Sequence, residues 1–168
     1  MTGTGYVSAN FSAWGGFATT ILLIVMFIGG CGGSTTCGIK VFRLQVLAST
    51  AKVQISRLLR PHAVVLAYYN KRPVSVEVMD SVMGFFYLFI LGFVLIAIML
   101  GMAGLDFVTA LSGAATSISN VGPGLGEVIG ADGNFSTLPD SAKWIMSFAM
   151  LLGRLEIFTV LVMLNPAF

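Results

Sequence analysis

The stretch IGGCGGSTTCGIK, residues 28–40, interrupts an apolar segment that is otherwise long enough for one membrane-spanning helix. Five of the ten residues from 29 to 38, which we call the glycine loop, are glycine. Each glycine destabilises a helix interior by about 1 kcal/mol relative to alanine, so we expect the helix to break here. Backbone without helical hydrogen bonds is tolerated at membrane depth only where protein buries it or a water-filled cavity solvates it. The stretch therefore predicts a pathway or a gate.

The composition is typical of an integral membrane protein. Of 168 residues, 57% are hydrophobic and 10% are charged, whereas soluble domains carry roughly 25% charged residues. A helical span needs about 20 apolar residues. Three stretches reach this length, at residues 14–39, 82–103 and 144–164. The sequence predicts an all-α membrane protein whose first span is broken by glycine.

The charges predict the orientation of the chain. Seven of the nine Lys and Arg residues lie between the first and second spans with no acidic residue among them: Lys40, Arg43, Lys52, Arg57, Arg60, Lys71 and Arg72. By the positive-inside rule this connection is cytoplasmic. Residues 104–143 carry four acidic residues and one lysine, so we expect them outside and the C-terminus in the cytoplasm. The start MTGTG resembles no signal peptide, and we interpret the chain as a fragment of a longer protein.

A second unusual stretch covers residues 105–119. It is too short and too rich in small polar residues to span a bilayer, yet too apolar for an ordinary loop. We interpret it as a re-entrant half-helix with Asp106 at the positive end of its dipole. Its negative end points at the sequence NVGPGLG, residues 120–126, whose backbone carbonyls would make a cation site there. The alternative is a surface helix followed by a Gly-Pro turn.

Two further features have open interpretations. Thr2-Gly3-Thr4-Gly5-Tyr6 is either an ordinary loop or a run whose carbonyls line a cation site, since potassium filters use Thr/Gly/Tyr runs. Arg154 and Glu156 lie inside the last apolar stretch, where charges are costly and mark a functional site by default. They either neutralise other helices, or Arg154 faces the ion route.

The basic segment from residue 36 onward has a helical pattern that Pro61 ends or kinks. Its basic side is either a solvated cytoplasmic face or a docking surface for a partner. Residues 70–73 predict a turn. Ser75 is a candidate cap for the next helix, although Val78 stands where a capping box has Glu or Gln.

The residue types argue against an enzyme. The chain has one histidine, no clustered carboxylates and no nucleophile paired with a base, which leaves no recognisable catalytic group. Cys31 and Cys37 have no histidine nearby and predict no metal site. A disulfide between them stays open, but close packing of small side chains is the simpler interpretation.

Three motifs together resemble the Trk/Ktr/HKT superfamily of potassium transporters, and within it the TrkH-type membrane subunits. They are FIGGCGGSTTCGIK at residues 27–40, NVGPGLG at 120–126 and LGRLEIFT at 152–159. The family fold is four repeats of span, pore helix and span around a central pore. The resemblance implies that residues 1–60 end the third repeat, 61–74 form a cytoplasmic connection, and 75–168 form the fourth. The first two repeats are absent, so this chain alone cannot close a pore.

The same resemblance implies roles for individual residues. Backbone carbonyls of two turns would bind potassium: the first turn is Thr2, Gly3, Thr4 and Gly5, and the second turn is Ser119, Asn120, Val121 and Gly122. The gate would comprise Gly29, Gly30, Gly32, Gly33, Ser34, Thr35, Thr36, Gly38 and Arg154. The sequence Thr35-Thr36-Cys37 departs from relatives that often have further glycine there, which puts the loop's flexibility in question.

By this likeness we expect potassium uptake across the bacterial inner membrane, with potassium as the transported ion and no cofactor. The implied partners are a second copy of the chain, membrane lipid and a cytoplasmic nucleotide-binding regulatory subunit of the TrkA type, which residues 40–72 would contact. No nucleic acid is expected. The alternative is a structural or non-catalytic subunit of another cation transporter, such as one for sodium.

Overall fold

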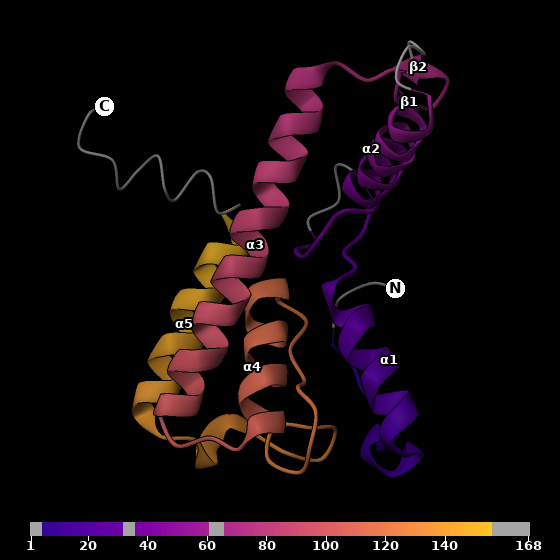
Figure 1. Cartoon of the computed structure of the whole chain (residues 1–168). Helices are drawn as coiled ribbons and strands as arrows, with labels where there is room; N and C mark the ends of the chain where they lie inside the picture. The colour runs from indigo at the N-terminus through magenta and orange to yellow at the C-terminus, as the bar shows by residue number, and fades with distance from the viewer. Residues whose placement is uncertain (1–4, 32–35, 61–65, 156–168) are drawn as a thin grey trace, which may run out of the picture.

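The computed structural model describes residues 5–31, 36–60 and 66–155, and this part of the chain is mainly helical (Figure 1). The elements in chain order are η1 (Phe11–Trp14), α1 (Gly16–Phe27), α2 (Val41–Leu59), β1 (Tyr68–Tyr69), β2 (Arg72–Pro73), α3 (Val76–Met102), α4 (Phe107–Ser119), η2 (Phe135–Thr137) and α5 (Asp140–Arg154). The predicted all-α class is confirmed. The division into residues 1–60, 61–74 and 75–168 stays a prediction.

Helix α4 lies at the centre of the bundle. It packs against α3 and α5 on one side and against α1 on the other (Figure 1). Its sequence from Thr109 to Ser119 consists almost entirely of Ala, Gly, Ser and Thr, and all of these small residues are buried. Small side chains let helix backbones approach closely in membrane proteins. The small polar residues make α4 too polar to span the membrane, but they allow the neighbouring helices to pack closely around it.

Helix α3 is the one helix among the described residues that is long and apolar enough to cross a membrane. Its 27 residues extend about 40 Å at 1.5 Å per residue, more than the hydrocarbon thickness of about 30 Å. The helix begins at Val76, six residues before the apolar stretch that the sequence analysis starts at residue 82. Glu77 and Asp80 precede the apolar stretch but are part of the same helix. Ser75 is the N-cap as predicted, but its side chain makes no capping bond.

The predicted break in the first span is confirmed. Helix α1 ends at Phe27, and its 12 residues cover only about 18 Å. The next helix, α2, begins at Val41 rather than near residue 36, because Ile28 and Ile39 form a parallel β-bridge that keeps both segments extended. Helix α2 ends at Leu59, just before Pro61. Helix α5 begins at Asp140, four residues before the predicted start at Trp144, and the end of that predicted span lies outside the described residues.

The helix predicted at residues 105–119 is confirmed as α4, which begins at Phe107; its re-entrant position in a membrane stays a prediction. Asp106 is its N-cap, and its carboxylate accepts a hydrogen bond from the Thr109 amide at 3.2 Å. The hydrogen bonds from Thr109 hold the pKa of Asp106 below its usual value, against a smaller opposing effect of desolvation. The carboxylate therefore stays ionised at neutral pH, where a negative charge at a helix N-terminus is stabilising.

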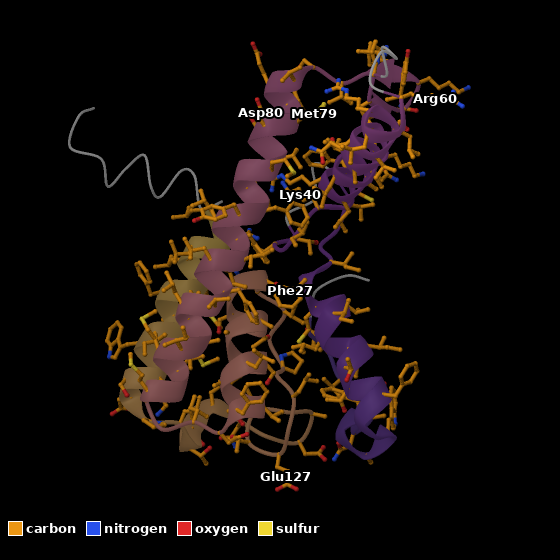
Figure 2. All side chains as sticks on the ribbon, in the orientation of Figure 1. Phe27, Lys40, Arg60, Met79, Asp80 and Glu127 are labelled. Atoms are coloured by element: carbon orange, nitrogen blue, oxygen red, sulfur yellow. The ribbon has the colours of Figure 1, made fainter. Side chains whose placement is uncertain are left out.

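A small hairpin closes the connection between α2 and α3. Strands β1 and β2 pair antiparallel across the predicted turn, in which Asn70 and Lys71 have positive φ angles. The hydroxyl of Ser49 on α2 donates to the Tyr68 carbonyl at 3.1 Å and accepts from the Tyr68 amide at 3.3 Å. The hairpin is thus attached to α2. Arg60 on this side and Glu127 beyond α4 lie at opposite ends of the molecule (Figure 2), as the predicted orientation requires.

Candidate functional site

The second turn follows directly from the C-terminus of α4. Asn120 adopts the left-handed conformation, with φ 52° and ψ 44°. The Val121 amide donates to the Thr116 carbonyl at 3.0 Å, and the Gly122 amide donates to the Thr116 hydroxyl at 2.9 Å. These bonds direct backbone N–H groups of the turn towards α4. The negative end of the α4 dipole therefore meets a turn whose N–H groups are already engaged, which is an environment that favours a cation.

The chain beyond the second turn is held to the same helix. The Ser112 hydroxyl accepts from the Leu125 amide at 3.0 Å and donates to the Leu125 carbonyl at 3.3 Å. The Gly124 amide donates to the Ile129 carbonyl at 2.7 Å. Figure 1 shows this segment running between α4 and α1. The turn is therefore fixed at both of its ends.

Gly5, the one described residue of the first predicted turn, lies against the second turn. A Cβ atom at Gly5 would collide with the carbonyl oxygen of Val121, and a Cβ atom at Gly122 would lie 3.8 Å from Gly5 Cα. Gly5 and Gly122 both have positive φ, at 73° and 111°. This close backbone approach requires glycine at position 5. The other residues of the first turn, Thr2, Gly3 and Thr4, lie outside the described residues.

A cavity of about 310 Å³ lies beside the two turns. Gly5, Ser119 and Val121 line one part of it, and Thr36 and Cys37 of the glycine loop line another. The Ser119 side chain is 2% exposed, and its hydroxyl oxygen has no hydrogen-bond partner among the described residues. The cavity thus places a buried hydroxyl and both turns next to the glycine loop.

Backbone hydrogen bonds close the base of the glycine loop. The Gly29 amide donates to the Ile39 carbonyl at 2.9 Å, the Ile39 amide to the Phe27 carbonyl at 2.8 Å, and the Val41 amide to the Gly30 carbonyl at 3.2 Å. The Phe27 ring packs edge-on against Phe89 and Phe93 of α3, with centroids 6.0 and 5.0 Å away. The base is therefore anchored to the bundle.

The two ends of the loop are tightly packed at Gly29 and Gly38. Gly38 has φ 83°, and a Cβ atom at Gly29 would collide with the Cys37 carbonyl oxygen. Gly32, Gly33, Ser34 and Thr35 lie outside the described residues. Cys31 and Cys37 are free thiols. Within the described ranges no group of His, Cys, Asp and Glu side chains is arranged to hold a metal ion.

Arg154 is brought to the glycine loop as predicted. It is the last residue of α5, and its Nη1 atom donates to Cys37 Sγ at 3.8 Å. Glu156, the other charge in this stretch, lies outside the described residues. The loop and the end of α5 are therefore in direct contact, although 117 positions separate the two residues.

Two contacts of α5, one with the second turn and one with the end of α4, were missed by the sequence interpretation. The Asn120 side-chain amide donates to the Met150 carbonyl at 3.0 Å. Gly153 lies directly against α4, because a Cβ atom there would collide with the carbonyl oxygen of Ile118. The only sequence signal was that a glycine precedes Arg154 in the last apolar stretch, and glycine allows two helices to approach closely.

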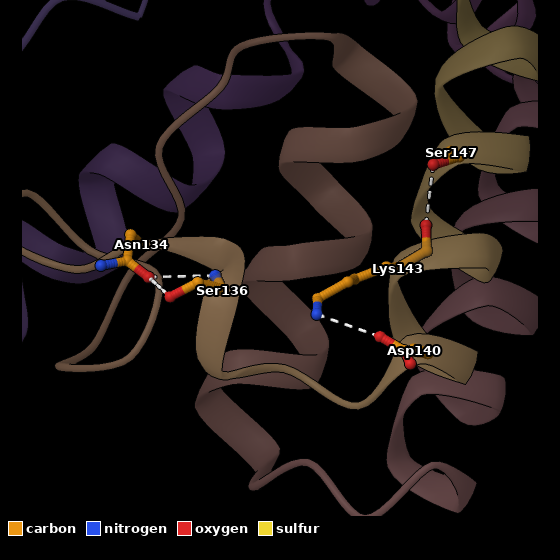
Figure 3. Close-up of polar contacts among 5 residues, drawn as sticks. All are labelled: Asn134, Ser136, Asp140, Lys143 and Ser147. Carbon is orange, nitrogen blue, oxygen red and sulfur yellow. Dashed lines mark hydrogen bonds and ion pairs between the residues drawn. The ribbon is translucent and has the colours of Figure 1, made fainter.

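Polar contacts order the surface at the opposite end of the bundle from α2. Figure 3 shows Asn134 Oδ1 accepting from the Ser136 amide at 3.0 Å and Lys143 Nζ pairing with Asp140 at 3.1 Å. Asn10 donates to Asp132 and so ties the segment before α1 to the loop after α4. Of these contacts, the bond between Asn10 and Asp132 is the one that joins separate segments, while the other two order the surface locally.

Comparison with known proteins gives a consistent result. The family model TrkH, described as a cation transport protein, matches residues 1–166. The chain is 48% identical over its whole length to the Trk system potassium uptake protein TrkI of Halomonas elongata. It is 36% identical over 99% of its length to the Trk system potassium uptake protein TrkH of Escherichia coli. It spans 34% of each of these relatives.

A solved structure agrees with the sequence comparisons. The crystal structure of the potassium transporter TrkH from Vibrio parahaemolyticus matches 98% of this chain with a TM-score of 0.89 and 39% identity. The match covers 35% of that protein. The arrangement of α1 to α5 is therefore similar to one part of a larger transporter.

Proposed function

This chain belongs to the TrkH family of cation transport proteins, and on that premise we propose that it supplies part of a potassium-conducting pore in a bacterial inner membrane. The chain covers 34% of the length of these relatives, so the residues described here account for only part of such a pore. The first and second turns are the filter segments, and carbonyl oxygens in them replace the hydration shell of the ion.

The observation that carries this proposal is the meeting of Gly5 with Val121 and Gly122 at the C-terminus of α4. Gly5 and Gly122 both have positive φ, and the Val121 carbonyl and the Pro123 ring leave no room for a side chain at position 5. The α4 dipole places partial negative charge at this point. Carbonyls and a helix C-terminus together favour a cation over an anion and need no titratable ligand.

The proposal is tested by uptake of radioactive rubidium into liposomes that contain the full-length protein carrying this chain. Rubidium has nearly the charge density of potassium, so it reports on the same site. We expect uptake that unlabelled potassium inhibits at concentrations at which sodium does not. Stronger inhibition by sodium would instead support the sodium-transporter alternative, and no cation uptake would contradict the filter.

The gate in this proposal is the glycine loop, held by Arg154. The loop borders the cavity beside the turns, and the contact between Arg154 and Cys37 restrains it. Since the base is fixed by backbone hydrogen bonds, movement during opening is confined to the residues between the base positions. In this proposal Arg154 holds the loop in its closed conformation through Cys37 and does not bind the ion.

Gly29→Ala is expected to raise basal rubidium uptake about fivefold, because the new methyl group must displace the Cys37 carbonyl and with it the contact to Arg154. A fivefold change corresponds to about 1 kcal/mol, the typical net contribution of one hydrogen bond. The measurement is the initial rate of uptake per folded protein. Gly16→Ala is the matched control, because a Cβ atom there meets nothing within 4 Å. Equal rates in both variants would argue against a gate at this loop.

The partners follow from the same premise. The relatives are named as members of a Trk system, and we propose a second copy of the protein and a TrkA-type nucleotide-binding subunit on the cytoplasmic side. The basic helix α2 and its hairpin are the docking surface for that subunit. The chain itself is not an enzyme in this proposal, and the transported ion is its only ligand.

A further inference from the structure

The last turn of α5, residues 150–154, lies between the second turn and the glycine loop. On one side the Met150 carbonyl accepts the Asn120 side-chain amide at 3.0 Å. Gly153 packs against the Ile118 carbonyl at the end of α4. Both contacts involve backbone atoms, which leaves little freedom for the second turn to move relative to α5.

The same turn of helix contacts the loop on its other side. Arg154 Nη1 lies 3.8 Å from Cys37 Sγ, and the Cys37 carbonyl packs against Gly29 at the base of the loop. Residues four apart on a helix are neighbours on one face, so Met150 and Arg154 are separated by a single turn. Cys37 contacts Arg154 and Asn120 contacts Met150, so one helical turn of α5 connects the two contacts.

Asn120 is suited to transmit a displacement of Cys37. Its left-handed backbone ends α4 and starts the second turn, so a rotation at this residue redirects the Val121 and Gly122 carbonyls. Asparagine tolerates this conformation better than most residues. Its side chain is held at the far end by α5, and so the residue joins the turn and the helix at two points.

We propose that the last turn of α5 couples the glycine loop to the second turn, with Asn120 as the positioning residue. The proposal rests on the function assigned above, in which the loop is the gate and the turn is the filter. Opening the loop shifts Arg154, and the shift reaches the filter through Met150 and Asn120. The filter geometry, and hence ion selectivity, then depends on the state of the gate.

Asn120→Gly tests the filter side of this coupling. Glycine adopts the left-handed conformation without strain, so the variant removes the bond to Met150 and keeps the backbone geometry. We expect the preference for rubidium over sodium to fall about fivefold, the effect of one hydrogen bond. The measurement is the ratio of rubidium to sodium uptake by the full-length protein in liposomes. Wild-type selectivity in a folded Asn120→Gly protein would overturn the role of Asn120.

The coupling itself is tested by combining Asn120→Gly with Arg154→Gln. Arg154 does not contact the filter in the proposal, yet we expect Arg154→Gln alone to lower selectivity as well as to raise uptake. In the double variant, selectivity is expected to be no lower than in Asn120→Gly, because the connection is already broken. Independent, multiplicative losses of selectivity would overturn the coupling.

Two controls keep the outcomes separate. Asn134→Gly removes an asparagine side chain that also bonds to the backbone, there as an acceptor from the Ser136 amide, at an exposed position in the outer loop, and is expected to keep wild-type selectivity. If Asn120→Gly does not fold, Asn120→Asp keeps the side-chain shape but cannot donate to Met150, and the same loss is expected. Absence of cation uptake by the wild-type protein would contradict the proposed function, whereas normal uptake with unchanged selectivity in every variant would contradict only the coupling.

Discussion

Gly153→Ala is expected to reduce rubidium uptake by the full-length protein at least about tenfold. The methyl group would collide with the Ile118 carbonyl oxygen, and a backbone atom cannot rotate away as a side chain can. Overpacking of this kind costs about 1–3 kcal/mol or more, and 1.4 kcal/mol corresponds to a factor of ten. Because Ile118 precedes the second turn by one residue, separation of α4 from α5 displaces the filter first. The measurements are uptake and the thermal unfolding temperature of the purified protein.

The control for this prediction is Gly101→Ala near the end of α3. A Cβ atom at Gly101 meets nothing within 4 Å, and alanine stabilises a helix interior by about 1 kcal/mol relative to glycine. We expect unchanged uptake and an equal or higher unfolding temperature. Wild-type uptake by Gly153→Ala would show that α4 and α5 can separate without consequence, in conflict with the proposed support of the filter.

Gly122→Ala is expected to abolish selective potassium transport through a change of conformation rather than a collision. Its φ of 111° lies in a region that side chains other than glycine rarely adopt, at a cost of order 1–3 kcal/mol. The nearest atom to the added methyl group is Gly5 Cα, at the ordinary contact distance of 3.8 Å. The turn must therefore change its backbone angles, which redirects its carbonyls. The measurement is rubidium uptake in the presence of competing sodium.

Gly104→Ala is the control that separates backbone strain at a positive φ angle from a location in the second turn. Gly104 has a similar φ of 91°, with nothing within 4 Å of an added Cβ atom, and it lies in the connection between α3 and α4. We expect a comparable loss of thermal stability in the two variants, with loss of uptake only in Gly122→Ala. Selective uptake by Gly122→Ala would remove the second turn from the filter.

The main elements were predictable because each depends on local composition. The density of glycine in residues 29–38 marks the end of α1 without knowledge of its neighbours. The small polar residues of α4 exclude a span, and Asp106 identifies its start. Ser75 predicted the start of α3, whereas the apolar stretch begins only at residue 82, because a charged residue such as Glu77 disfavours the membrane interior but not the helix.

The contacts that join the site were less accessible from the sequence. The proximity of Arg154 and the glycine loop followed from the family resemblance rather than from spacing. The bond from Asn120 to Met150 depends on how closely α5 approaches α4, and this distance is decided by the tertiary position of Gly153. Periodicity places a residue on a face of a helix, but it does not say which carbonyl that face will meet.

The closed base of the glycine loop has a consequence for protein engineering. Its three hydrogen bonds join main-chain atoms only, between Phe27 and Ile39, Gly29 and Ile39, and Gly30 and Val41. Formation of the base therefore does not depend on which side chains the residues further along the loop carry. We expect that residues 31–36 can be exchanged for the corresponding segment of a relative without loss of the bundle, provided that Cys37, which contacts Arg154 and Gly29, is kept. In the proposed function such exchanges would alter the rate of opening.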